Sequence, residues 1–472
     1  MQHRRWGGQG GRGRLSPIVA LAGAALVLSS MFAGSVPREQ RPPRAEMSPR
    51  LEHTAARRPN ILLIVTDDQR VDAMKGMNNT RRWFRRGGTR FANAFTPTPN
   101  CCPARSSIMT GRYPHSTGVL TNHSGQGALD QSTTIQRRLH NAGYRTAIFG
   151  KYFNFWNLAN RPPSFDRWAI HSWRYNGAEF NVQGRRRIVS QYVTDYIAGK
   201  AARFLRRWGR RGPWFLYVAP FAPHHPFTPE SAYANAQFPR RARNPSLRER
   251  NKRDKPRWVR HAHLSPREAA AIRRSQLRTL QSVDDLVARL LRILGDIGER
   301  RDTLAVYTSD NGYLWAEHGL EDKGHVYKPS IQVPLFARWP GHFKRGSVDR
   351  RLVSLVDIAP TIVQAARLGR RRAMDGRSLL SSSARTNLLV EYFRDPDRNH
   401  IPSWSSLLTK SSQYVEYRAG GRVTFREYYD LERDPWQLQN VFRDGRRNNN
   451  PDARALHRAL RRARGCRGRS CP

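Results

Sequence analysis

The chain has 472 residues, a length that suggests roughly two to three domains, or one large α/β unit with a smaller one. Hydrophobic residues make up 38% of it and aromatic residues 10%, which excludes a disordered polymer. Lysine and arginine number 83 against 36 acidic residues, a formal net charge of +47. Such a charge attracts polyanions, nucleic acid or anionic membranes. The arginines run through the whole chain rather than one stripe, so we interpret most of them as surface composition and expect no specific nucleic-acid partner.

The N-terminal segment 1–36 has the pattern of an export signal or a membrane anchor. Several arginines precede an apolar run at 18–32, and small residues follow at 33–35. The run is shorter than the ~20 residues that a spanning helix prefers, although its apolar character extends over 15–34. We therefore expect an exported protein, secreted or associated with the cell envelope, that meets a membrane only if this segment is retained. Residues 37–58 form a Pro/Arg-rich linker.

Four apolar runs are typical of buried parallel strands, and each is followed closely by polar side chains. These runs are 60–65, 144–149, 214–219 and 303–307. The residues that follow them are Asp67 and Asp68, then Lys151, then His224, then Asp310 and Asn311. The carboxyl ends of parallel strands are where open α/β sheets place their ligands. The pattern therefore predicts a site at these strand ends.

Helical patterns lie between the strands. Residues 275–294 carry apolar side chains near helical spacing, with Gly295 just past the end, and 354–368 also predicts a helix. Alternating strands and helices indicate an α/β sandwich with a mainly parallel sheet. The basic, proline-containing segment 239–260 is a long connecting loop. After about residue 374, short strand-like runs suggest a small antiparallel subdomain; they are 388–393, 413–417 and 422–428.

The most informative segment is 101–112, Cys-Cys-Pro-Ala-Arg-Ser-Ser-Ile-Met-Thr-Gly-Arg. A thiol beside a guanidinium can be a nucleophile held next to an anion-binding group. The alternative is a vicinal disulfide between Cys101 and Cys102, which is geometrically strained. The other two cysteines, Cys466 and Cys471, lie close together in a basic tail, where their spacing in an exported chain suits a small disulfide loop.

A hard-cation site is predicted from the acidic strand ends. Asp67, Asp68, Asp310 and Asn311 offer three carboxylates and one amide, the oxygen ligands that Ca²⁺ or Mg²⁺ prefers. Taken singly, each aspartate is more often a turn or helix-cap residue. Two acidic clusters at equivalent strand ends, with the cysteine motif between them in the sequence, favour the cation.

Four further side chains are candidates for the site, and each has a plain structural alternative when taken alone. Lys151 follows a glycine at a strand end, and His224 lies between prolines that restrict it. Lys323 lies in the run Glu-Asp-Lys-Gly-His. His115 closely follows the cysteine motif, and we expect that it can also face the site.

The motif 101–112 resembles the signature of the type I sulfatases, Cys-x-Pro-x-Arg followed by Thr-Gly-Arg, and the likeness extends from Asn60 to about Val441. The Lys-Tyr-Phe-Asn run at 151–154 and the tail cysteine pair resemble the N-acetylglucosamine-6-sulfatase branch and its bacterial relatives. The resemblance implies an α/β, alkaline-phosphatase-like sandwich. Its large, mainly parallel central sheet would be flanked by helices, with a small C-terminal antiparallel-sheet subdomain. The implied boundaries are 59–373 for the catalytic domain, 374–445 for the subdomain and 446–472 for the basic tail.

The resemblance also implies an activity, the hydrolysis of sulfate monoesters. In that family the first cysteine, here Cys101, is oxidised to formylglycine by a formylglycine-generating enzyme. The substrate would be a sulfated small molecule or glycan, such as 6-sulfated N-acetylglucosamine. The implied ligands of Ca²⁺, with Mg²⁺ as the alternative, are Asp67, Asp68, Asp310, Asn311 and the modified Cys101.

Catalytic roles follow from the same resemblance. Arg105 would stabilise the formylglycine hydrate, Lys151 and Lys323 would hold sulfate oxygens, and His224 would lie near the leaving oxygen. This allocation is physically reasonable, because a sulfate ester needs positive charge around its oxygens while negative charge builds on the leaving group. Asp310 is placed to accept a proton from the attacking hydroxyl.

Two departures from the family pattern leave alternatives open. Many members have Lys-Trp-His where this chain has Lys-Tyr-Phe-Asn, so the base for the second hydroxyl is missing, and His115 or Asn154 are the candidates to replace it. Tyr327 is followed by Lys328 where an acidic residue is common. Phosphate and sulfate esters share tetrahedral geometry, which makes a phosphodiesterase or phosphonate monoester hydrolase the alternative enzyme. The high charge and the missing histidine also motivate a catalytically dead polyanion-binding protein.

Overall fold

The computed structural model describes residues 58–369 and 374–472. The described residues group into one compact unit. The predicted export segment and almost all of the linker lie outside the described residues. Among the helices that the model does describe, none combines the length and the apolar character needed to cross a membrane.

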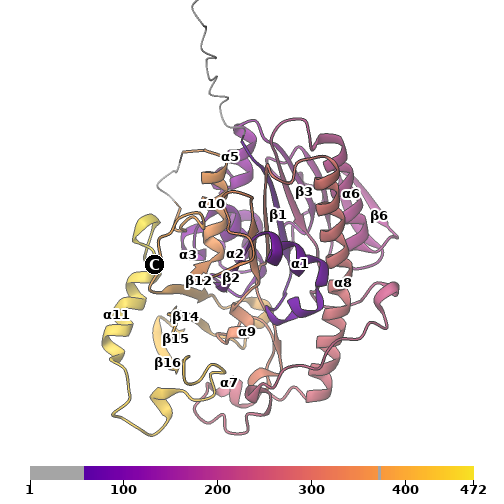
Figure 1. The fold of residues 1–472 in the computed structure, drawn as a ribbon. Coiled ribbons are helices and arrows are strands. Elements are labelled where there is room, and N and C mark those ends of the chain that lie inside the picture. Colours follow the sequence, from indigo (N-terminus) through magenta and orange to yellow (C-terminus); the bar gives the residue numbers. More distant parts are fainter. Residues whose placement is uncertain (1–57, 370–373) are drawn as a thin grey trace, which may run out of the picture. The chain divides into compact units, whose positions relative to one another are not determined.

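A ten-stranded sheet forms the centre of this unit (Figure 1). Its spatial order is β12-β2-β11-β8-β1-β7-β3-β4-β5-β6. The adjacent strands β8, β1, β7, β3 and β4 all run parallel, whereas β11, β5 and β6 are antiparallel to their neighbours. The bounds are β1 (Asn60–Thr66), β2 (Thr89–Phe95), β3 (Arg145–Gly150), β4 (Arg167–His171), β5 (Ala178–Val182), β6 (Arg185–Val189), β7 (Trp214–Ala219), β8 (Thr303–Ser309), β11 (Leu335–Arg338) and β12 (Ser347–Ser354).

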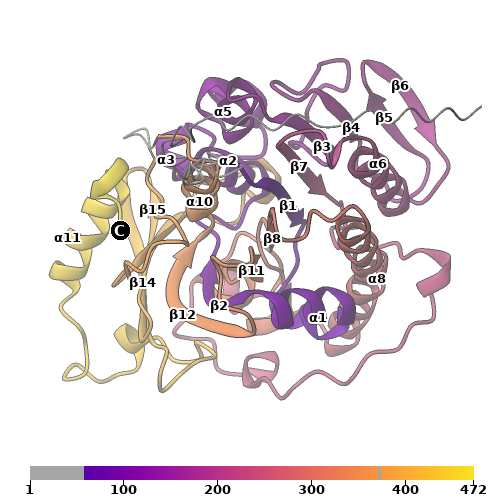
Figure 2. The ribbon, with the colours of Figure 1, turned by 45° about the horizontal axis from the view of Figure 1, so that its top comes forward.

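Helices cover both faces of the sheet, because its central strands are apolar on both sides. Leu62 and Ile64 of β1 belong to one core cluster, which also takes side chains from α1 (Asn78–Gly87), α6 (Val193–Trp208) and α8 (Pro266–Asp296). Ile61, Leu63 and Val65 face the opposite cluster, with α2 (Cys101–Thr110), α5 (Ile135–Asn141) and α10 (Ile358–Ala365). Figure 2 shows α1 and α8 on one side of the strands and α2, α5 and α10 on the other. The predicted α/β sandwich is confirmed.

The four predicted strands are present, with ends shifted by at most two residues. The long predicted helix begins earlier, at Pro266, because Ser265 and Glu268 form a reciprocal cap: each side chain accepts a hydrogen bond from the other's backbone N–H. It also continues through Gly295. The helix predicted over 354–368 is shorter, since β12 extends to Ser354 and α10 covers only Ile358–Ala365. The segment 239–260 is largely irregular, with a short 3-10 helix at Pro245–Arg248 and a short α-helix, α7 (Arg257–Arg260).

The C-terminal part forms a second sheet, which is antiparallel as predicted. Its order is β13 (Leu388–Tyr392), β14 (Ser403–Leu408), β15 (Ser412–Ala419) and β16 (Arg422–Asp430). Strand β14 was not predicted, because its serine-rich sequence gives little apolar signal. The tail holds a helix, α11 (Ala453–Arg464), that packs on this sheet beside the disulfide between Cys466 and Cys471 (Figure 1). The remaining α-helices and β-strands are α3 (Pro114–Thr117), α4 (Gly125–Ala128), α9 (Lys328–Ile331), β9 (Leu314–Trp315) and β10 (Glu321–Asp322).

Candidate active site

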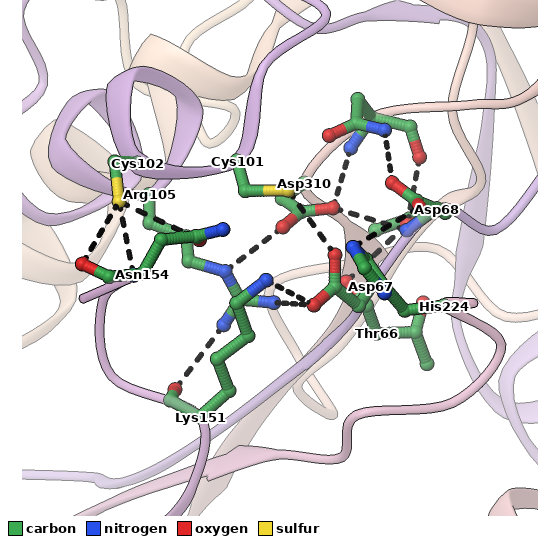
Figure 3. Close-up of polar contacts among 12 residues, drawn as sticks. Thr66, Asp67, Asp68, Cys101, Cys102, Arg105, Lys151, Asn154, His224 and Asp310 are labelled. Carbon is green, nitrogen blue, oxygen red and sulfur yellow. Dashed lines mark hydrogen bonds and ion pairs between the residues drawn. The ribbon is translucent and has the colours of Figure 1, made fainter. Parts of the chain in front are cut away.

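The carboxyl ends of the parallel strands gather the predicted polar side chains (Figure 3). Asp67 and Asp68 follow β1, Lys151 follows β3, and Asp310 follows β8. His224, from the turn after β7, brings its Nε2 to 3.8 Å from Asp68 Oδ2. Because neighbouring parallel strands end at the same edge of a sheet, residues far apart in sequence become neighbours here.

Helix α2 brings Cys101 into this group. Cys101 is the first residue of the helix, and all ten residues of the helix are buried. Its thiol donates to Asp67 Oδ1 at 3.4 Å and accepts from Lys323 Nζ at 3.0 Å. Cys102 points away, and its sulfur accepts the backbone N–H of Asn154 at 3.0 Å (Figure 3). Both thiols are free, so the vicinal disulfide is not formed.

Three buried carboxylates are matched by three buried cations. Arg105 Nε donates to Asp310 Oδ2 at 2.8 Å, and Lys151 Nζ donates to Asp67 Oδ2 at 2.5 Å. Lys323 Nζ donates to Asp68 Oδ1. Buried charges are tolerated only when they are paired in this way, which explains why the cluster is closely packed.

The donor set fits a divalent cation. Oxygen atoms of Asp67, Asp68 and Asp310 all lie within 4.8 Å of one another. The amide oxygen of Asn311 is buried without a hydrogen-bond partner, as expected of a ligand atom. Asp310 Oδ1 is held by the backbone N–H groups of Asp68 at 3.2 Å and Asn311 at 2.8 Å. Carboxylate and amide oxygens are the ligands of Ca²⁺ and Mg²⁺.

The pKa values of the clustered side chains are shifted in opposite directions. Burial raises the pKa of Asp310, and the negative charge of Asp67 adds to this, so that it reaches about 7. Burial acts in the same direction on Asp67, but the charges of Lys151, His224, Arg105 and Lys323 together hold its pKa well below the usual range. Burial, reinforced by Asp67, raises the pKa of the Cys101 thiol well above its ordinary value. An unmodified Cys101 is therefore a protonated thiol and a poor nucleophile.

The structure brings together nearly all of the predicted residues. They are Asp67, Asp68, Cys101, Arg105, Lys151, His224, Asp310, Asn311 and Lys323. His115 is the exception. Its Nδ1 lies 2.8 Å from Glu391 Oε1 and its Nε2 lies 2.9 Å from the carbonyl oxygen of Cys466. The expectation that it faces the site is wrong, because β13 and the tail use both ring nitrogens.

The second candidate for the missing histidine, Asn154, lies beside Cys102 rather than Cys101; its amide oxygen is 3.5 Å from the Cys102 sulfur. Tyr217 also belongs to the site but was not predicted from the sequence; its hydroxyl accepts a hydrogen bond from Arg105 Nη1 at 3.1 Å. Tyr217 lies inside the correctly predicted strand β7, and nothing in the local pattern distinguishes it from a core tyrosine. Trp173, with its ring centroid 5.9 Å from Lys151 Nζ, follows β4, a strand that was not predicted.

Comparisons with known proteins give consistent findings. A family model described as "Sulfatase" matches residues 59–368, and one described as "N-sulphoglucosamine sulphohydrolase, C-terminal" matches residues 316–464. The chain is 30% identical to an N-acetylglucosamine-6-sulfatase of Capra hircus, over 82% of this chain and 80% of the relative. It is 35% identical to an extracellular sulfatase SULF-1 homolog of Drosophila melanogaster, over 77% of this chain, but spans only about a third (34%) of that relative's length.

Solved structures share the fold at lower identity. One, described as a complex with its substrate D-glucosamine-2-N,6-O-disulfate, is 24% identical with a TM-score of 0.74, covering 86% of this chain and 97% of that chain. A phosphonate monoester hydrolase of Agrobacterium radiobacter is 21% identical with a TM-score of 0.65, covering 82% and 92%. These similarities show that the architecture is shared.

Proposed function

Because the chain belongs to the sulfatase family of sulfuric ester hydrolases, we propose that it hydrolyses sulfate monoesters of sugars at a formylglycine formed from Cys101. The reaction adds water to the ester and releases an alcohol and sulfate. The observation that carries the proposal is the position of Cys101, whose sulfur lies between the Asp67 carboxylate and the Lys323 ammonium. A formylglycine-generating enzyme would supply the modification during maturation.

The side chains around residue 101 have complementary tasks. A formylglycine at residue 101 would supply, as its hydrate, two hydroxyls on one carbon. Arg105 would orient this group, and Lys151 and Lys323 would place positive charge around the sulfate oxygens, where it stabilises the transition state. The His224 side chain is 17% exposed, while the Asp68 side chain beside it is 2% exposed. We therefore place the leaving alcohol on the side of His224.

The cation belongs to the same proposal. Asp67, Asp68, Asp310, Asn311 and residue 101 would hold Ca²⁺, with Mg²⁺ as the alternative. A bound cation supplies positive charge that lowers the pKa of a neighbouring hydroxyl. It would also compensate part of the negative charge that a sulfate ester brings to the cluster.

We propose 6-sulfated N-acetylglucosamine, free or within a glycan, as the substrate class. Support comes from relatives named N-acetylglucosamine-6-sulfatase in Capra hircus and Homo sapiens, each 30% identical to this chain. Export is part of the proposal and is supported by the N-terminal pattern and by the relatives described as extracellular sulfatases. A catalytically dead binding protein would have no need for the buried set of matched charges around Cys101.

The test begins with the mass of the proteolytic peptide that contains Cys101, taken from protein purified from its native host. We expect a peptide lighter than the thiol form by the difference between cysteine and formylglycine. The same protein is then assayed for sulfate release from N-acetylglucosamine-6-sulfate and for phosphate release from phosphodiesters and phosphonate monoesters. Cys101→Ala should abolish release, and Cys102→Ala, which leaves Cys101 in place, is the matched control.

Each outcome has a defined meaning. Phosphodiester or phosphonate turnover far above sulfate turnover would replace the sulfatase proposal with the phosphonate hydrolase alternative. An unmodified thiol, with no ester hydrolysed and heparin binding retained in Cys101→Ala, would favour the polyanion-binding protein.

A further inference from the structure

An exposed pair of aromatic side chains lies beside the site. Five large hydrophobic residues are exposed in the described part of the chain, and two of them, Phe155 at 45% and Trp173 at 37%, contact each other with ring centroids 4.9 Å apart. Neither ring is fully buried in the hydrophobic core. Clustered exposed apolar side chains on a soluble protein often mark a binding surface.

The pair is continuous with the site. The Trp173 ring centroid is 6.5 Å from that of His224 and 5.9 Å from Lys151 Nζ. On its other side, Phe155 stacks on His123 with centroids 4.4 Å apart and an interplanar angle of 26°. We call His123, Phe155 and Trp173 the aromatic platform. It extends outward from the lysine that would hold sulfate.

The platform also has polar groups at its far end. His123 Nε2 lies 3.0 Å from Asp397 Oδ1, and both side chains are substantially exposed. Asp397 comes from the loop between β13 and β14, so the C-terminal part of the chain reaches the platform. A surface that combines aromatic faces with a few exposed hydrogen-bonding groups is typical of small-molecule sites.

The backbone at Phe155 is held in an unfavourable conformation. Its φ is +56°, in the left-handed region that bulky residues rarely adopt. The Phe155 ring that this backbone conformation positions is 45% exposed. The unfavourable backbone is therefore not explained by burial of the ring in the core. Strained residues of this kind are concentrated at functional sites.

We propose that the aromatic platform is the sugar-binding subsite, in which Trp173 and Phe155 contact the apolar C–H face of a sulfated pyranose. The sulfate group then lies toward Lys151 and Lys323, and His123 and Asp397 face the ring hydroxyls. Aromatic rings suit this task, because their faces are electron-rich and pyranose C–H groups are weakly positive. This inference rests on the proposed function and names the part of the site that selects a sugar over other sulfate esters.

The test separates binding of the sugar ring from binding of the sulfate group by using N-acetylglucosamine and inorganic sulfate, each alone, as inhibitors. Wild type, Trp173→Ala, Phe155→Ala and Trp173→Phe are assayed with N-acetylglucosamine-6-sulfate, and inhibition constants are measured for N-acetylglucosamine and for inorganic sulfate. Trp436→Ala is the control, since Trp436 is similarly exposed at 39% and is not part of the platform.

We expect Trp173→Ala and Phe155→Ala to raise both KM and the inhibition constant of N-acetylglucosamine, roughly five- to tenfold each. The inhibition constant of inorganic sulfate should stay unchanged, and Trp173→Phe should retain most of the affinity. Unchanged KM and sugar inhibition in both alanine variants would overturn the proposal. An equal loss of sulfate affinity would also overturn it, because Trp173 would then act by supporting Lys151.

Failure of the proposed function has a different signature. If wild type releases sulfate from no sulfated sugar, binding of N-acetylglucosamine is measured by saturation-transfer NMR. A wild-type signal that is lost in Trp173→Ala would still support the platform. Absence of a signal in wild type, or its persistence in both alanine variants, would contradict it.

Discussion

Lys323 Nζ lies 3.0 Å from Cys101 Sγ and at the same time donates a hydrogen bond to Asp68. One buried ammonium therefore links Cys101, the residue that we propose is modified, to a predicted cation ligand. Burial alone would lower the pKa of Lys323, but the negative charge of Asp68 beside it raises the pKa well above its ordinary value. Lys323 is charged throughout the physiological pH range.

Replacing Lys323 by methionine should remove this charge while keeping most of the side-chain volume. We expect kcat/KM for the sulfate ester to fall by about 10²- to 10³-fold, the usual effect of losing one charge-stabilising donor. Sulfate release measures the change. Lys328→Met, five residues further on, is the matched control and should stay close to wild type. Equal activity in Lys323→Met would show that this lysine does not serve the reaction.

Gly150 sets the position of Lys151. A Cβ at residue 150 would lie 2.0 Å from the carbonyl oxygen of Ala219, and the φ of +119° already disfavours other residues. Gly150→Ala should therefore push β3 away from β7, with a loss of at least about 2 kcal/mol in the free energy of unfolding and severe loss of sulfate release. Chemical denaturation and the activity assay give both quantities.

Gly143→Ala is the control for backbone strain. Its φ is +82°, but a Cβ there would meet nothing within 4 Å. It should lose only about 1 kcal/mol and keep its activity. If Gly150→Ala and Gly143→Ala lose equal stability and activity, the close contact between residue 150 and Ala219 is not the cause of the loss.

Ca²⁺ should stabilise the protein through the carboxylate cluster. A cation at 100 times its dissociation constant adds about 2.7 kcal/mol to the free energy of unfolding. We expect Tm to rise with added Ca²⁺, to fall with EDTA, and to respond much less in Asn311→Ala, which lacks the unpartnered amide oxygen. Repeating the titration with Mg²⁺ compares the two ions.

A second group of potential metal ligands serves as the control, and it consists of His123, Asp395 and Asp397. Asp397→Asn should keep the full Ca²⁺ response. If this variant loses the response while Asn311→Ala keeps it, the cation binds at the second group.

His115 should make stability depend on pH. Burial lowers its pKa, but the hydrogen bond and the charge of Glu391 outweigh this, so the net pKa is raised above 6.5. A raised folded-state pKa means that the protonated form stabilises the fold. This contribution is fully present below the unfolded value of 6.5 and is lost as the pH rises through the folded value.

Thermal unfolding of wild type and His115→Ala between pH 5 and pH 9 tests this, since the range covers the titration of a histidine with a raised pKa (about 6.5 and above). The difference in Tm should be largest at the acidic end and shrink as the pH rises. His261→Ala, which removes an exposed histidine, is the control for the loss of an imidazole as such. A difference that grows with pH would contradict the assigned ion pair.

The sequence by itself determined four of the ten strands of the central sheet and most of the side chains of the candidate site. The strands at 60–65, 144–149, 214–219 and 303–307 could be predicted because apolar runs of branched side chains are local signals. Their polar ends could be grouped because parallel strands end at one edge of the sheet. The cysteine motif is likewise contiguous in the sequence, and its resemblance to the sulfatase signature implied a place beside the acidic strand ends.

Only the tertiary structure decided the rest. His115 is close to Cys101 in sequence, yet Glu391 and Cys466, 276 and 351 residues away, bind its ring. Phe155 and Trp173 lie in irregular segments after different strands and meet only when β3 and β4 pair. Long-range contacts of this kind depend on how whole helices and strands pack together. The local sequence pattern around each residue therefore does not predict them.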